Sequence, residues 1–108
     1  MEKIFVYGTL KKGFGNNRIL DNETFVGRDT ITGWNMIDLG PFPAIVAGTK
    51  HIIGEVWEVN SLQELDLLEG FPSFYDRVQV DTIHGNAWVY VMDDNTMNDT
   101  IIETGEWI

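Results

Sequence analysis

A single stretch of this 108-residue chain carries strong helix signals, so the fold must be built mainly from strands and loops. Ser61 followed three residues later by Glu64 is a capping-box pattern, which marks a helix start. Gly70 suits a C-terminal cap, and Pro72 lies just beyond it. The pattern therefore predicts one helix over residues 61–70.

Runs rich in β-branched and aromatic residues predict strands at residues 3–7, 30–38, 51–59, 75–83 and 86–92. His84 and Gly85 separate the last two, a spacing that suits a hairpin turn. Pro41 and Pro43 predict a bend or a sheet edge. We therefore expect an α+β fold with an antiparallel-leaning sheet, curled into a barrel and covered by one or two short helices.

The tail beyond Asp93 is polar until Ile101 and Ile102, and Trp107 lies near its end. We expect it to pack back onto the sheet through these apolar side chains. The length fits one domain over residues 1–108, and 44% apolar residues are enough for a core.

Composition excludes several classes of protein. The chain has no cysteine, which excludes disulfides, thiolate zinc sites and a cysteine nucleophile and suits a cytoplasmic protein. It shows no signal-peptide pattern and no apolar run of ~18 residues, so no membrane association is expected. The net charge of -10 repels phosphate backbones, which argues against nucleic-acid binding.

Three of the seven basic residues, Lys11, Lys12 and Arg18, lie in or just after the first loop. They would attract a small anionic group there, or they form an ordinary solvated basic turn. The sequence leaves both interpretations open.

The first loop has the sequence VYGTLKKGFGNN from Val6 onward. Its glycines do not fit a nucleotide P-loop, because Phe14 and Gly15 follow Gly13 where that motif needs Lys and Ser or Thr. The dinucleotide fingerprint is one residue short and lacks a following βαβ unit. Gly8 then either makes a tight turn or lets backbone N–H groups approach an oxyanion or carboxylate.

Glu69 is the unusual residue of the predicted helix. At ~100° per residue it falls between Leu62 and Leu65, on the stripe that should face the core. Burial would raise its pKa toward the range in which a carboxyl group both takes and gives protons. Two simpler explanations are a frayed last turn open to solvent and a salt bridge to Arg77.

Other catalytic groups are scarce. Ser61 suits a helix cap, Ser73 lies in a loop, and His51 and His84 are expected at the surface. No cluster has the spacing of metal ligands, so we expect no metal, no cofactor and no covalent nucleophile. An enzyme of this kind needs a substrate that carries its own nucleophile.

The chain resembles the gamma-glutamylcyclotransferase-like family, and most closely its small gamma-glutamylamine members. The resemblance rests on motifs in the family's order, from Phe5 to about residue 90: Tyr7-Gly8-Thr9-Leu10 with Gly13, Leu39-Gly40-Pro41-Phe42-Pro43-Ala44, Gly54-Glu55-Val56-Trp57-Glu58-Val59, Leu65-Asp66-x-x-Glu69-Gly70 and Tyr75-x-Arg77. It implies a small mixed, mainly antiparallel β-barrel. It also implies that Glu69 is the catalytic acid/base, that Tyr7, Gly8, Thr9 and Leu10 bind the glutamyl part of a substrate, and that Tyr75 lies near the cavity.

The reaction that the resemblance implies is an intramolecular one. The α-amine of a small gamma-glutamyl compound attacks its own γ-carbonyl and releases 5-oxoproline and an amine. Two alternatives remain. The chain could be a non-catalytic module that binds such a ligand, or an interaction module whose acidic surface meets a basic partner. The leaving amine and the oligomeric state do not follow from the sequence.

Overall fold

The computed structural model describes residues 1–93 and 100–108, and this part of the chain forms a six-stranded sheet with two short helices. In chain order the elements are β1 (Glu2–Val6), η1 (Gly15–Leu20), β2 (Thr24–Asp38), β3 (Pro43–Val59), α1 (Gln63–Glu69), β4 (Asp76–Thr82), β5 (Gly85–Val91) and β6 (Thr100–Ile101). Neither described helix is long and apolar enough to cross a membrane.

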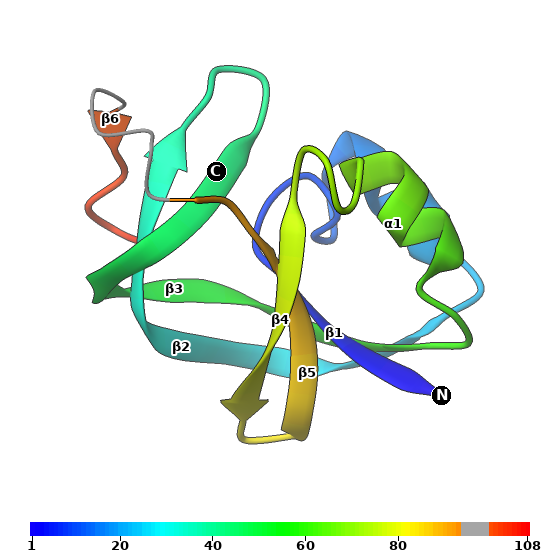
Figure 1. Cartoon of the computed structure of the whole chain (residues 1–108). Coiled ribbons are helices and arrows are strands. Elements are labelled where there is room, and N and C mark those ends of the chain that lie inside the picture. Colours follow the sequence, from blue (N-terminus) through cyan, green and yellow to red (C-terminus); the bar gives the residue numbers. More distant parts are fainter. Residues whose placement is uncertain (94–99) are drawn as a thin grey trace.

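The sheet is mixed, in the order β4-β5-β1-β3-β2-β6. β1 runs parallel to β5, with Ile4 opposite Trp88, and the other neighbours are antiparallel. Figure 1 shows the sheet curled into a half-barrel, with α1 and η1 together on its right-hand side. The predicted small, mixed and mainly antiparallel barrel-like fold is confirmed.

The β2–β3 hairpin is much longer than predicted, because both strands begin earlier, at Thr24 and at Pro43. Near Gly27 the register shifts, and such a bulge interrupts the alternation by which strands are recognised. Pro43 is the first residue of β3, a place where a missing N–H is tolerated. The predicted bend is therefore limited to residues 39–42, and the apolar run after Pro43 is strand.

The hairpin between β4 and β5 was predicted correctly except for its turn. Thr82 pairs with Gly85, so the two connecting residues are Ile83 and His84 rather than His84 and Gly85. Gly85 has a φ of 102°, which favours glycine at that position. β1 likewise begins and ends one residue earlier than predicted.

α1 begins at Gln63, two residues after the predicted start. The Oγ of Ser61 accepts a hydrogen bond from the N–H of Gln63 at 3.1 Å, so Ser61 does satisfy one free N–H of the first turn. Gly70 ends the helix in the left-handed conformation, as predicted. The sequence did not locate the second helix, η1, because its glycines and asparagines favour turns as readily as helix.

Side chains of β1 alternate between two core clusters. Ile4 and Val6 pack with the α1 residues Leu62 and Leu65, and Phe5 packs in the second cluster. That second cluster also holds Ile102 and Trp107, so the expected packing of the tail is confirmed for these two side chains. Ile101 instead lies in β6 and is half exposed, while most of the polar stretch after Asp93 lies outside the described residues.

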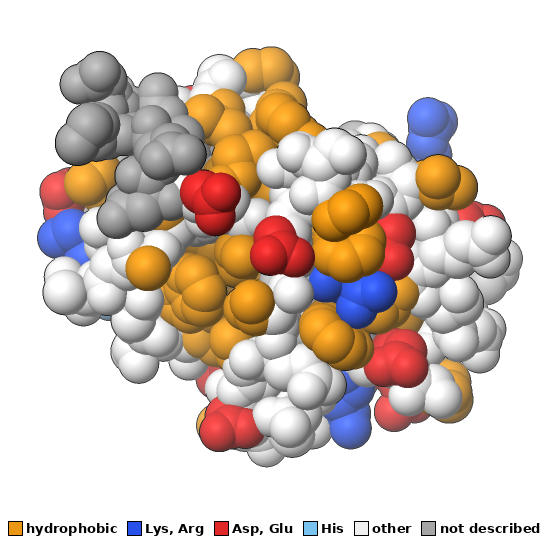
Figure 2. Space-filling view, in the orientation of Figure 1, with side chains coloured by type: hydrophobic (Ala, Val, Ile, Leu, Met, Phe, Trp, Pro, Cys, Tyr) orange, Lys and Arg blue, Asp and Glu red, His pale blue; other side chains and the backbone are white. Residues whose placement is uncertain are grey.

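Figure 2 shows that hydrophobic side chains cover part of the visible face, with isolated acidic side chains among them.

Candidate active site

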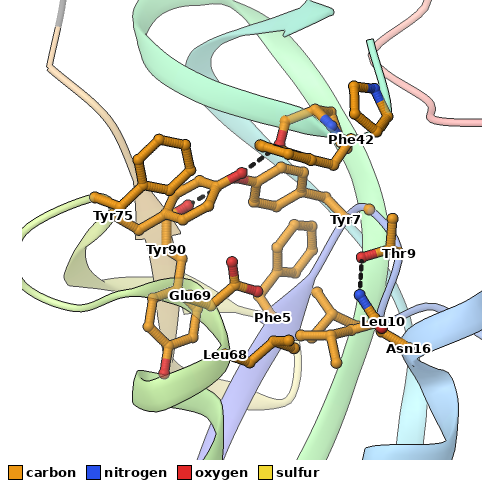
Figure 3. A pocket seen from close by; sticks show the side chains of 15 residues that line it. Phe5, Tyr7, Thr9, Leu10, Asn16, Phe42, Leu68, Glu69, Tyr75 and Tyr90 are labelled. Atoms are coloured by element: carbon orange, nitrogen blue, oxygen red, sulfur yellow. Dashed lines mark hydrogen bonds between the residues drawn. The ribbon is translucent and has the colours of Figure 1, made fainter. Parts of the chain in front are cut away.

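Four segments that are distant in the sequence surround a cavity of about 380 Å³. They are the end of β1 with the loop after it, the bend before β3, the segment from the last turn of α1 to the start of β4, and β5. Such a volume suits a small organic molecule. Figure 3 shows the side chains of these segments pointing toward a common space.

The backbone carbonyl groups of the loop after β1 accept hydrogen bonds from the loop itself and from the first residues of η1. The carbonyl of Gly8 accepts from the N–H three residues later at 3.1 Å, and that of Thr9 accepts from the N–H of Asn16 at 3.1 Å. The carbonyl of Leu10 accepts from the side-chain amide of Asn17 at 2.8 Å, while Asn16 Nδ2 donates to Thr9 Oγ1 at 3.0 Å. The two asparagines thus fix the loop, a role that sequence analysis did not assign to them.

The N–H groups of Gly8, Thr9 and Leu10 make no hydrogen bond to any described residue, although all three residues line the cavity. Gly8 does not owe its identity to a positive φ. A Cβ placed there would instead lie 2.8 Å from Cγ of Pro43, which is too close for any ordinary contact. The absence of a side chain at Gly8 therefore lets the loop pack tightly against the start of β3.

Glu69 lies at the end of α1 and lines the cavity, and Figure 3 shows its carboxylate pointing into the enclosed space. Burial raises the pKa of Glu69 from 4.5 to about 7. No described residue forms an ion pair or hydrogen bond with this carboxylate, so nothing offsets the cost of burial. The alternative of a salt bridge to Arg77 is wrong, because Arg77 binds Asp66 instead.

Tyrosine side chains form one wall of the cavity. The hydroxyl of Tyr7 donates to the carbonyl of Tyr90 at 2.8 Å, and that of Tyr75 donates to the carbonyl of Pro43 at 2.6 Å. Burial, followed by the proximity of Glu69, raises the pKa of Tyr75, so its phenol remains neutral. Because each hydroxyl proton is already used, these two tyrosines act on the cavity mainly through shape.

A polar cluster behind the cavity ties α1 to the sheet. Asp66 accepts from Arg77 Nε at 3.0 Å and Nη2 at 3.3 Å, and from the hydroxyl of Tyr90 at 2.7 Å. The Arg77 guanidinium lies 4.5 Å from the ring centroids of both Phe71 and Trp88. Sequence analysis missed this cluster, although Asp66 falls ~40° from Leu62 around the helix, at the edge of the apolar stripe, which was a signal for it.

The three basic residues of the first loop do not line the cavity, which contradicts their suggested role in attracting an anion there. Lys11 Nζ is buried and donates to the carbonyl of Trp107 at 2.7 Å, and burial lowers its pKa. Lys12 Nζ lies 3.6 Å from the ring centroid of Phe25. Arg18 belongs to η1 and also lies away from the cavity wall.

The other polar residues considered as catalytic groups also lie outside the cavity wall. Ser73, His51 and His84 do not line the cavity, and His51 is exposed while His84 packs against Gly27. Among residues 1–93 and 100–108, no group of three or more His, Asp or Glu side chains is arranged to hold a metal ion. Of the residues singled out from the sequence, the structure gathers Tyr7, Gly8, Thr9, Leu10, Glu69 and Tyr75 around one cavity.

Comparison with known proteins identifies relatives along nearly the whole chain. Residues 4–108 match the family model described as gamma-glutamyl cyclotransferase, AIG2-like. A putative gamma-glutamylcyclotransferase of Vibrio cholerae is 35% identical over 107 residues, which cover 96% of this chain and 93% of the relative. The family protein YtfP of Escherichia coli K12 is 33% identical, covering 98% of this chain and 96% of the relative.

Solved structures agree with this relationship. The crystal structure of protein PH0828 from Pyrococcus horikoshii has a TM-score of 0.83 at 27% identity, and the match covers 98% of this chain and 89% of that one. The solution structure of YtfP from Escherichia coli has a TM-score of 0.79 at 34% identity, covering 98% and 96%. In sequence and in fold, the chain belongs to the gamma-glutamyl cyclotransferase, AIG2-like family.

Proposed function

We propose that this protein is a gamma-glutamyl cyclotransferase in which Glu69 is the general acid and base. One observation carries the proposal: a partly buried carboxyl group with a pKa of about 7 shares a cavity with three backbone N–H groups that bind no described residue. A group that titrates near neutral pH is suited to move protons in both directions. Consecutive N–H groups are suited to bind a negatively charged oxygen.

The proposed reaction needs no nucleophile from the protein. A gamma-glutamyl amide carries a free α-amine that can reach its own γ-carbonyl carbon and close a five-membered ring. The new bond joins the α-nitrogen to this carbon, and the bond between the carbon and the amide nitrogen breaks. The products are 5-oxoproline and a free amine. Folding the substrate into the reactive geometry supplies much of the acceleration.

Glu69 supplies the proton transfers. Its carboxylate takes a proton from the α-ammonium group of the substrate, which frees the lone pair for attack. The protonated carboxyl group then gives this proton to the departing amide nitrogen, and the ring nitrogen loses its remaining extra proton to water, so the catalyst returns to its starting state. The N–H groups of Gly8, Thr9 and Leu10 would hold the oxygen on which negative charge develops. Tyr7 and Tyr75 would confine the glutamyl part between loop and helix.

The test is release of 5-oxoproline from gamma-glutamyl amides by purified wild-type protein and by Glu69→Gln. We expect product from the wild type, and kcat/KM that falls as the pH drops below about 7, because the base is then protonated. Glu69→Gln should keep the wild-type melting temperature or exceed it. A folded Glu69→Gln protein with wild-type activity would refute the assignment, and binding without turnover by the wild type would favour a ligand-binding module.

A further inference from the structure

Two buried charged residues contact the first loop or belong to it. Among residues 1–93 and 100–108, only two charged side chains are buried, those of Lys11 and Glu55, which are 7% and 9% exposed. Neither of them lines the cavity as the structure describes it. Burying a charged group is costly unless its polar atoms find partners. The partners of Lys11 and Glu55 therefore indicate what the fold gains from them.

The side chain of Lys11 joins the loop to the segment over residues 100–108. Its Nζ donates to the carbonyl of Trp107 at 2.7 Å. That segment is itself fixed to the sheet, because the carbonyl of Gly105 accepts from the N–H of Ile53 in β3 at 2.8 Å. The Trp107 side chain also packs in the second core cluster. Lys11 therefore attaches the loop to a part of the molecule that is held at several points.

Glu55 holds the backbone of the loop one residue further on. It lies in β3, and its Oε1 accepts from the N–H of Lys12 at 3.1 Å. The same oxygen accepts from Nε1 of Trp57 at 3.1 Å, which fixes the direction of the carboxylate. Hydrogen bonds to a carboxylate are stronger than those between neutral groups. The two buried residues thus anchor consecutive positions of the loop.

The anchored positions close the turn that carries the free N–H groups. The N–H of Lys11 donates to the carbonyl of Gly8 at 3.1 Å, which makes one hydrogen-bonded turn. The N–H groups of Gly8, Thr9 and Leu10, which bind no described residue, all belong to this turn. Figure 3 shows Thr9 and Leu10 beside the space into which the Glu69 carboxylate points. A displacement of Lys11 would therefore change the direction of these N–H groups.

We propose that Lys11 and Glu55 are positioning residues for the proposed reaction. They hold the turn after β1 from outside the cavity, so that its N–H groups meet the oxygen on which negative charge develops. This inference rests on the proposed function and adds two residues that do not touch the substrate. Donors that are aligned before the reaction stabilise such an oxygen best, and a displacement of about 1 Å is costly in rate.

Lys11→Met tests the first contact, because Met keeps most of the apolar length of Lys but cannot donate to the Trp107 carbonyl. We use the gamma-glutamyl amide that the wild type cleaves fastest. We expect kcat to fall about tenfold to hundredfold and KM to stay within about threefold, since the N–H groups act mainly in the transition state. The decline of kcat/KM below about pH 7 should stay in place, because Glu69 is unchanged. Wild-type kcat, or a loss confined to KM, would overturn the inference.

Lys50→Met is the matched control. Lys50 Nζ binds Glu103 Oε2 at 2.8 Å, in the same segment as Trp107, but no hydrogen bond joins it to the first loop, all of which the structure describes. We expect wild-type kcat and KM for Lys50→Met. A loss of kcat as large as that of Lys11→Met would show that any weakening of the segment slows the reaction, and it would contradict the role of Lys11.

A pair of variants tests the second contact. Glu55→Gln keeps an oxygen that can accept from the N–H of Lys12, whereas Glu55→Leu removes the acceptor. The Leu variant should lose about tenfold or more in kcat, and the Gln variant should retain most of the wild-type value. A merely structural role would lower the melting temperature of Glu55→Leu and leave kcat of the folded protein unchanged, which would overturn the role of Glu55. Should Glu55→Leu fail to fold, Lys11→Met decides the inference.

Amide hydrogen exchange reports on the loop without any substrate. In Lys11→Met, the N–H groups of residues 11, 12 and 14 should exchange about tenfold or more faster, while those between β1 and β3 keep wild-type rates. If no gamma-glutamyl amide yields 5-oxoproline, the proposed function fails, and this measurement decides whether the buried residues hold the loop. Faster exchange confined to the loop would support that role, and unchanged exchange would overturn it.

Discussion

Two carboxylates on the same short helix have opposite environments. Asp66 faces the sheet and accepts three hydrogen bonds, from Arg77 and Tyr90. Glu69, almost one turn later, faces the cavity and binds none of the described side chains, and burial raises its pKa to about 7. The difference teaches that burial alone does not make a carboxylate reactive. A partnered carboxylate holds structure together, whereas an unpartnered one beside open space is free to exchange protons.

The difference between Asp66 and Glu69 is tested most directly by neutralising each carboxylate in turn. Glu69→Gln should lower kcat/KM for 5-oxoproline release by about 10²–10⁴-fold, because the proton-transfer group is lost while its shape remains. Asp66→Asn should act mainly on stability and leave measurable turnover. Both are compared with the wild type at pH 8 in the same assay. An Asp66→Asn protein that is folded yet as inactive as Glu69→Gln would show that Asp66 is not merely structural.

The stability of the protein should report the cost of burying Glu69. Because its folded pKa is about 7 and its unfolded value is 4.5, the folded protein holds an extra proton between these pH values. The contribution of Glu69 to the free energy of unfolding is therefore greatest below pH 4.5. It falls as pH rises to about 7, by up to about 3 kcal/mol.

Urea denaturation of wild type and Glu69→Gln at pH 5 and pH 8 measures this effect. The variant should gain stability relative to the wild type as the pH rises. Glu64→Gln, at an exposed position of the same helix, serves as control and should keep the wild-type trend. A stability difference between wild type and Glu69→Gln that does not change with pH would contradict the raised pKa.

Removing the charge of Asp66 tests the structural half of the comparison. Asp66→Asn should lower the free energy of unfolding by about 2 kcal/mol, because the largely buried Arg77 loses its charged partner. Urea titration gives the value. Asp81→Asn, on the exposed side of β4, is the control and should fall within ~0.5 kcal/mol of the wild type. Equal stability of the Asp66 and Asp81 variants would show that the cluster does not anchor α1.

The smallest effect is expected from Tyr90→Phe. It removes one of the three hydrogen bonds to Asp66 and leaves the pair with Arg77 in place, so about 1 kcal/mol should be lost. Combining it with Asp66→Ala tests the contact directly. The double variant should be less destabilised than the sum of the single ones, since Tyr90→Phe and Asp66→Ala both remove the same hydrogen bond. Strict additivity would mean that Tyr90 does not act through Asp66.

Sequence periodicity located Glu69 because a helix repeats every ~3.6 residues, and a charged residue on the apolar stripe is visible without any structure. The same periodicity could not say which carboxylate Arg77 would reach, because that depends on where β4 crosses the helix. A salt bridge between Arg77 and Glu69 was only one of the alternatives, and the structure pairs Arg77 with Asp66 instead. Local patterns thus identified the unusual residue, whereas its separation from a counter-ion is a property of the tertiary fold.

In the first loop, too, local patterns in the sequence predicted one part of the structure and missed another. Its glycines argued against a phosphate loop, but the contribution of Asn16 and Asn17 depends on side chains that turn back to oxygen atoms seven residues earlier. The extent of β3 was missed because the apolar run after Pro43 is bounded by prolines and a glycine, which usually mark loops. In both places the sequence signal is local, and the structure depends on distant partners.

The contact between Gly8 and Pro43 has a consequence for protein engineering. Pro43 touches the first loop through its ring and holds the Tyr75 hydroxyl through its carbonyl, so it links two segments of the cavity wall that are distant in the sequence. Enlarging position 8 would shift this proline and with it the tyrosine. A library intended to change substrate preference should therefore vary positions 8, 43 and 75 as one block.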